Sequence, residues 1–117
     1  MSFWRKQVIQ PALASDVEVA EGEQRAILDR DPQNAGAYSA LGTLANFRGD
    51  RDAAVKLYQK ALDLDASRAE AHVGLGRICV VRGLYTEAWK HAREAERLGD
   101  RSLVAQLERY PNAADKG

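Results

Sequence analysis

Apolar side chains recur at intervals of three and four residues along most of this chain, the spacing that places them on one face of an α-helix. No segment alternates apolar and polar residues over more than a few positions, so we expect almost no β-strand. The pattern and its breaks predict six helices, at residues 16–30, 34–48, 51–64, 68–82, 85–98 and 102–110. Because the turns between them are short, we expect neighbouring helices to pack antiparallel in an all-α fold.

Several of these helix boundaries have a local chemical cause. In a capping box a serine hydroxyl accepts from an exposed backbone N–H and a glutamate three residues later reaches back to the cap. Two such boxes open the first and fourth helices: Ser15 with Glu18, and Ser67 with Glu70. Pro32 ends the first helix, because proline disfavours helical geometry in the residue before it. Three glycines supply the left-handed residue that ends a helix: Gly49, Gly83 and Gly99.

Residues 35–68 and 69–102 align without gaps at a spacing of 34. The identical pairs are Ala35/Ala69, Ala37/Ala71, Leu41/Leu75, Gly42/Gly76, Arg48/Arg82, Gly49/Gly83, Ala54/Ala88, Lys56/Lys90, Ala61/Ala95 and Leu64/Leu98. A fixed period of this size is typical of stacked helical units, none of which can bury its apolar face alone.

The residues of these units resemble the tetratricopeptide repeat family, whose pattern is W-x2-L-G-x2-Y followed by A-x3-F and a closing proline. The matching residues are Tyr38, Leu41, Gly42, Ala54 and Tyr58 in the first unit, and His72, Leu75, Gly76 and Ala88 in the second. The resemblance implies a right-handed superhelical stack of antiparallel helix hairpins. Its glycines and alanines stand where two helices approach closely.

The same resemblance predicts a single domain over residues 1–111. It comprises a degenerate leading repeat at 1–34, full repeats at 35–68 and 69–102, and a capping helix at 102–111 that covers the last hairpin. Trp4 matches the family tryptophan, but Pro11 would break a continuous helix in the leading repeat. That repeat is therefore either degenerate or begins with a short helix that meets the next at Pro11. We expect residues 112–117 to form a flexible tail.

Composition and charge narrow the class of protein. The 117 residues include 17 basic and 17 acidic side chains, so no overall field favours nucleic acid. No apolar run is long enough to span a bilayer, and we expect no integral membrane association. Cys79 is the only cysteine, which excludes an intrachain disulfide and suits a reducing compartment. The apolar stretch near the N-terminus is too broken for a good export signal, so we expect a cytoplasmic protein.

The residues that could carry chemistry are few. The pair Gly74-x-Gly76 lies inside a predicted helix with no strand before it, so it is not a phosphate-binding loop. His72, His91 and Cys79 lack the spacing of zinc ligands, and we interpret them as structural residues. We therefore predict neither a metal site nor a cofactor, and we do not expect an enzyme.

The family resemblance implies that the first helices of successive hairpins line a concave groove, which receives an extended peptide or a helix of another protein. The candidate partner-binding residues on that face are Ser39, Thr43, Asn46, Phe47, Val73, Arg77 and Val80. Ser39, Thr43 and Asn46 follow helical steps and form one polar ridge. Arg77 would either bind a partner carboxylate, pair with Glu70 or reach solvent.

These residues favour a protein–protein interaction module: a scaffold, adaptor or assembly chaperone. A well-known subgroup of the family binds acidic chaperone C-termini through several lysine, asparagine and arginine residues. Because Arg77 stands nearly alone among the groove residues here, we do not expect that function.

The N-terminal segment suggests a second hypothesis. Phe3, Trp4, Val8 and Ile9 concentrate apolar area around two basic residues. This segment would cover the first hairpin, join a second copy in a homodimer or touch a membrane interface. A regulatory subunit attached to an enzyme is a further alternative.

Overall fold

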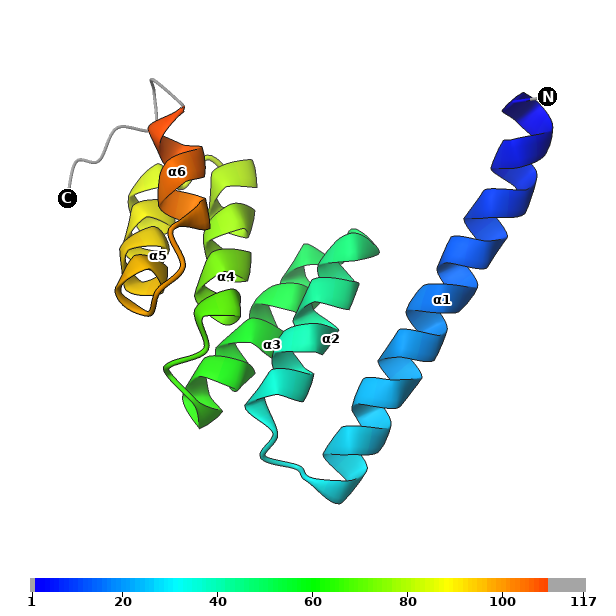
Figure 1. The fold of residues 1–117 in the computed structure, drawn as a ribbon, viewed down its shortest axis with the longest axis horizontal. Coiled ribbons are helices and arrows are strands. Elements are labelled where there is room, and N and C mark those ends of the chain that lie inside the picture. Colours follow the sequence, from blue (N-terminus) through cyan, green and yellow to red (C-terminus); the bar gives the residue numbers. More distant parts are fainter. Residues whose placement is uncertain (1, 110–117) are drawn as a thin grey trace.

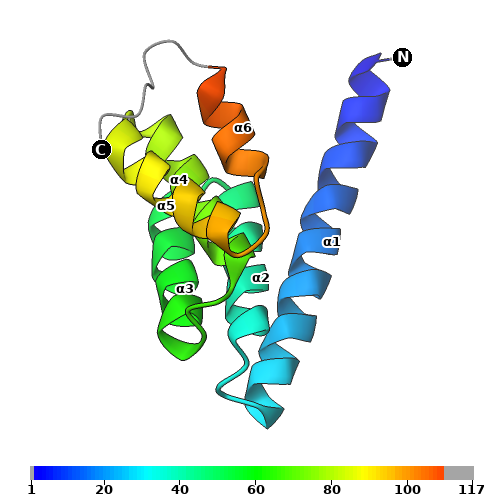
Figure 2. The same ribbon diagram turned by 60° about the vertical axis from the view of Figure 1, so that its left-hand side comes forward.

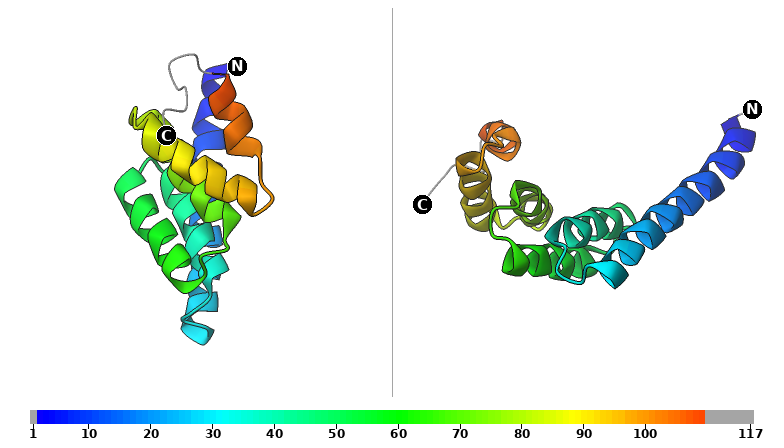
Figure 3. Two further views of the ribbon diagram at one scale, coloured as in Figure 1. Left: turned by 90° about the vertical axis from the view of Figure 1, so that its left-hand side faces the viewer. Right: turned by 60° about the horizontal axis from the view of Figure 1, so that its bottom comes forward.

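The computed structural model describes residues 2–109, with side chains from residue 15 onward. Every regular element in this part of the chain is a helix: α1 (Ser2–Arg30), α2 (Ala35–Phe47), α3 (Arg51–Leu64), α4 (Ala69–Val81), α5 (Tyr85–Arg97) and α6 (Ser102–Glu108). Helices α2 and α3, and then α4 and α5, pack as antiparallel pairs joined by short turns (Figure 1). The pairs follow one another along a curved row that starts at α1 (Figure 3).

Local sequence signals place most of these helices correctly. Asn34 Oδ1 accepts from the N–H of Ala37 at 2.9 Å, and Asp50 Oδ1 accepts from that of Ala53 at 3.1 Å, so each caps the helix that follows it. The three glycines after α2, α4 and α5 have φ angles of 89°, 75° and 103° in the left-handed region. The predicted bounds of these helices are confirmed to within a residue at each end.

The first helix departs from the prediction. α1 is continuous over 29 residues, so Ser15 lies inside it and does not cap it, and Pro11 does not break it. The leading unit within residues 1–34 is therefore one helix in place of a hairpin. Residues 12–14 are alanine and leucine, which are strong helix formers, and no glycine turns the chain there. None of the helices described here, α1 included, has the length and apolarity needed to cross a membrane.

The capping box predicted before α4 is also wrong. The N-cap of α4 is Arg68, which makes no capping hydrogen bond with its side chain. Ser67 turns back instead, because its hydroxyl and its N–H both donate to Asp65 Oδ1, at 2.6 and 3.0 Å. These two bonds lower the pKa of Asp65. Glu70, the expected partner in the box, forms an ion pair with Arg68.

Tyr58 of α3 is the large side chain of the first hydrophobic cluster. Its buried neighbours there are mostly small, namely Ala45, Ala54, Ala61, Ala71, Leu75 and Ile78. The ring lies against two glycines of the neighbouring first helices. A Cβ built at Gly42 of α2 would stand 2.9 Å from the ring, and one at Gly74 of α4 only 2.3 Å from it. Tyr58 therefore occupies space that exists only because both helices carry glycine there.

A second cluster closes the other end of the row. Its buried members come from α5 and α6: Ala88, Ala92, Leu103, Val104 and Leu107. α6 packs on both α4 and α5 (Figure 2). A Cβ at Gly76 of α4 would stand 2.1 Å from Leu103 Cδ2, so this glycine admits α6 to the surface of the last hairpin. Tyr110 and Pro111, which were assigned to the cap by sequence, lie outside the described residues.

The two types of glycine position predict opposite effects of alanine. Gly74→Ala should destabilise the protein by about 1–3 kcal/mol, because the new methyl group overlaps the buried ring of Tyr58. Gly22→Ala in α1 is the matched control: nothing lies within 4 Å of its Cβ position, so it should stabilise by about 0.5–1 kcal/mol. Urea unfolding followed by circular dichroism measures both. Equal midpoints for the two variants would contradict the role of Gly74.

Candidate functional site

A hollow of about 300 Å³ lies between the first helices of the two hairpins, and we call it the α2–α4 groove. It is lined by residues of α2, α3 and α4 and by the segment that enters α6: Thr43, Asn46, Tyr58, Glu70, Val73, Gly74, Arg77, Asp100 and Ser102. The groove joins both repeats, because α2 comes from one and α4 from the next.

The floor of the groove carries a pair of hydroxyl groups. Tyr58 Oη lies 2.8 Å from Thr43 Oγ1, and Thr43 Oγ1 donates to the carbonyl of Ser39 at 3.3 Å. Since the threonine proton is used in that bond, Tyr58 donates to Thr43. Burial raises the pKa of Tyr58, and the Thr43 hydrogen bond and the charge of Arg77 offset only part of this rise. The phenol is therefore protonated at neutral pH.

The rim of the groove carries one cation and two carboxylates. Glu70 is engaged by Arg68. Asp100 accepts from the N–H of Ser102 at 2.9 Å, and the hydrogen bonds of Ser102, followed by the more distant charge of Arg77, lower the pKa of Asp100. Arg77 itself is exposed and forms no hydrogen bond or ion pair within the described residues. Of the charged groups on the rim, the Arg77 guanidinium is therefore the one whose N–H groups are all available to a ligand.

The structure brings together four of the seven residues assigned to the groove by sequence, namely Thr43, Asn46, Val73 and Arg77. The expected exposure is wrong at two positions. Ser39 is only 2% exposed, and Val73 only 6%. Both lie on helices that pack against more than one hairpin partner, α2 against α1, α3 and α4 and α4 against α2, α3, α5 and α6, which buries more of their surface than a single hairpin would.

The remaining two assigned residues lie elsewhere. Val80 is half-buried against the second hydrophobic cluster. Phe47 is 67% exposed and borders a separate, shallow apolar hollow with Val17 of α1 and Leu44. Phe3, Trp4, Val8 and Ile9, assigned to self-association or capping, have side chains outside the described part of the chain.

Five lining residues of the groove were not among those assigned by sequence: Tyr58, Glu70, Gly74, Asp100 and Ser102. Tyr58 was recognised only as a packing residue of the repeat. The signal for its second role is the pair Gly42 and Gly74, which opens a path for the ring between α2 and α4. Asp100 and Ser102 enter the groove only because α6 folds back onto α4, and no local pattern predicts that contact.

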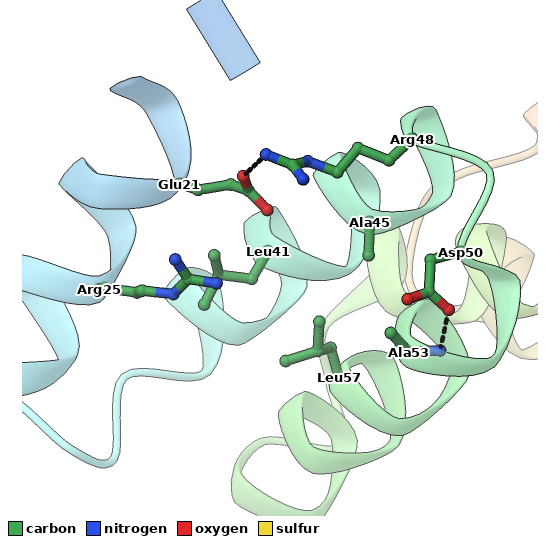
Figure 4. Close-up of a pocket in the computed structure, with 8 residues that line it drawn as sticks. All are labelled: Glu21, Arg25, Leu41, Ala45, Arg48, Asp50, Ala53 and Leu57. Atoms are coloured by element: carbon green, nitrogen blue, oxygen red, sulfur yellow. Dashed lines mark hydrogen bonds and ion pairs between the residues drawn. The ribbon is translucent and has the colours of Figure 1, made fainter. Parts of the chain in front are cut away.

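A second hollow, also about 300 Å³, lies where α1 meets α2 and α3 (Figure 4). Its apolar lining residues are Leu41, Ala45, Ala53 and Leu57. At its edge Glu21, which is only 9% exposed, pairs with Arg48 through Oε1 and Nη2 at 2.6 Å. Asp50 is engaged as the cap of α3, while Arg25 stays exposed. The carboxylates here are used in internal contacts, so we interpret this hollow as a joint between α1 and the first hairpin.

The same type of joint recurs one repeat later. Arg82, which stands 34 residues after Arg48, donates to Asp52 of α3 at 2.8 Å. Each first helix therefore ends at an arginine that reaches back to the preceding helix. Arg48 and Arg82 are thus identical in the repeat, and each makes a contact between neighbouring units.

Metal-binding groups are sparse in the part of the chain that the structure describes, which contains no cluster of three or more potential ligands. Burial raises the pKa of the Cys79 thiol, and Glu87 adds to the rise, so this cysteine is protonated at neutral pH. Comparison with models of known families and with curated proteins finds no match to this chain.

The hydroxyl pair on the groove floor should contribute measurably to stability. Tyr58→Phe should cost about 1 kcal/mol, because Thr43 loses its partly buried partner, and a cycle with Thr43→Val should give a coupling energy of about 1 kcal/mol. Tyr85→Phe is the control, since the Tyr85 hydroxyl has no hydrogen-bond partner among the described residues. Urea unfolding of the four cycle members and the control gives these values. A Tyr58→Phe cost no larger than that of the control would exclude the pair.

Proposed function

We propose that this chain is a protein–protein interaction module of the tetratricopeptide type that binds an extended peptide or a helix of a partner in the α2–α4 groove. The 34-residue repeat, its resemblance to that family and the two packed helix pairs support the proposal. The proposal includes a right-handed superhelical arrangement of the helix pairs. The module would act as a scaffold, adaptor or assembly chaperone.

One observation carries this proposal: Arg77 extends its uncommitted guanidinium from the wall of a hollow that both repeats line. The hydroxyl pair of Thr43 and Tyr58 and the amide of Asn46 lie in the same hollow, and all three can hydrogen-bond to a peptide backbone. A guanidinium beside such groups recognises a carboxylate, which it can bind through two parallel hydrogen bonds.

The two rim carboxylates limit which partner can enter. Glu70 and Asp100 would repel a strongly acidic segment from the same hollow that Arg77 lines. We therefore propose a partner segment with a single acidic side chain at Arg77, flanked by neutral or basic residues. An acidic C-terminal tail of the kind bound by the chaperone-receptor subgroup does not meet this requirement.

Charge reversal at Arg77 tests the proposal. Peptides selected from a random displayed library on the intact chain should contain one acidic residue, and Arg77→Glu should weaken their binding by about tenfold to a hundredfold. Fluorescence anisotropy with the labelled peptides measures the dissociation constants. Arg51→Glu is the matched control, because Arg51 is exposed at the start of α3 and does not line the groove.

Location of the bound peptide provides the second test. Amide chemical shifts of Thr43, Asn46 and Arg77 should respond to the peptide, while those around Arg51 should not. Equal affinities for the Arg77→Glu and Arg51→Glu variants, or shifts confined to another surface, would overturn the proposal.

A further inference from the structure

The only two histidines of the chain meet inside the second hairpin. His72 of α4 and His91 of α5 lie with their Nδ1 atoms 3.3 Å apart, and their ring centroids are separated by 5.5 Å. Both side chains are half-buried. At this distance one neutral imidazole donates its N–H to the unprotonated nitrogen of the other.

The first hairpin has an apolar contact at the equivalent place. Counting back 34 residues, His72 corresponds to Tyr38 and His91 to Leu57, and both of these pack against the first hydrophobic cluster. The charge beside the pair is also reversed. Lys60 lies over the ring of Tyr38 at 6.0 Å, whereas its counterpart Glu94 is acidic. The second hairpin thus holds a titratable contact where the first holds a permanent one.

The pair is close to the junction of α4, α5 and α6. A Cβ built at Gly76 would stand 3.2 Å from His91 Cβ and 2.1 Å from Leu103 of α6. His91 therefore borders, through its Cβ, the same crossing that seats α6. Val73 and Arg77 of α4, together with Asp100 and Ser102 before α6, line the groove on this side.

The charges around the two imidazoles do not favour double protonation. Burial lowers the pKa of His91 below its ordinary value of 6.5, the proximity of His72 lowers it further, and Glu87 opposes this only in part. Glu87 is itself paired with Lys90, and Glu94, which lies near His72, is paired with Arg97. Both of these glutamates belong to α5, the helix that carries His91.

We propose that His72 and His91 make the second hairpin, and with it one wall of the α2–α4 groove, responsive to mild acid. With one proton shared between the facing nitrogens, the pair links α4 to α5. When both rings are protonated, the facing nitrogens are both donors, the hydrogen bond is lost and two positive charges lie side by side. The hairpin and α6 then loosen before the first hairpin does.

The direction of the effect follows from proton linkage. The unfolded chain binds a proton at His91 more readily than the folded chain does. The contribution of His91 to stability is therefore fully present above the ordinary histidine pKa and is lost as the pH falls from that value through the lower pKa of the folded chain. If the pKa of His91 is lower by one in the folded chain than in the unfolded chain, the folding equilibrium constant falls about tenfold once the pH is below both values. The carboxylates with lowered pKa, Asp65, Glu94 and Asp100, lose their contribution only at more acid pH, since their ordinary values are 3.8 to 4.5.

The first repeat supplies the variant that tests this proposal. His72→Tyr combined with His91→Leu installs the residues of the first hairpin at the equivalent positions. Between about pH 7.5 and about pH 5 the wild-type Cm in urea should fall, and the fall should be absent or much smaller in the double variant. Equal pH dependence of the two proteins in this range would overturn the proposal.

A measurement on the unaltered chain guards against misfolding of the variant. The two histidine Cε1 proton resonances of the wild type should titrate with the His91 pKa below 6.5. Amides of α4, α5 and α6 should lose hydrogen-exchange protection at about pH 5 before those of α2 and α3. A His91 pKa at or above 6.5, or uniform loss of protection across both hairpins, would contradict the proposal. Neither measurement uses a partner. A negative result would therefore overturn the proposed acid response without bearing on the proposed peptide binding.

Discussion

The position of Tyr58 between two glycine-bearing helices is the constraint on which the rest of the molecule depends. The first hydrophobic cluster is built largely from alanines, which let helices approach but offer little area of their own. One large ring therefore links α2, α3 and α4 in a single contact, and it does so only because Gly42 and Gly74 leave room. The same side chain ends in a hydroxyl on the groove floor, so the packing of the repeats and the polarity of the groove have one cause.

The repeat separates positions that hold units together from positions that distinguish them. Arg48 and Arg82 are identical, and each pairs with an acidic residue of the preceding helix. By contrast, position 43 is threonine in one repeat while its counterpart, Arg77, is charged, and both line the groove. Identity at the two arginines therefore reports packing between units. The difference between Thr43 and Arg77 reports the chemistry that each unit presents to the groove.

Sequence reasoning succeeded where the cause of a structure is local. Asn34, Asp50 and the helix-ending glycines act on backbone groups within four residues, and they account for the starts of α2 and α3 and for the ends of α2, α4 and α5. It failed where a distant or competing contact decides. Ser67 has the spacing of a cap, but Asp65 offers its hydroxyl a charged acceptor at 2.6 Å. Ser15 also has that spacing, yet the helix before it leaves no free N–H groups to cap.

The groove shows the same limit of periodicity. A three- and four-residue spacing places Ser39 and Thr43 on one face of α2, but it cannot say how wide the exposed part of that face is. α2 packs against α1, α3 and α4, so only a narrow strip of it stays open. Ser39 falls inside the packed surface and Thr43 outside it. Because the open strip of α2 is this narrow, α2 would offer a partner few groups in the proposed binding mode, and the charges of Arg77, Glu70 and Asp100 on the rim would then carry most of the selectivity of the groove.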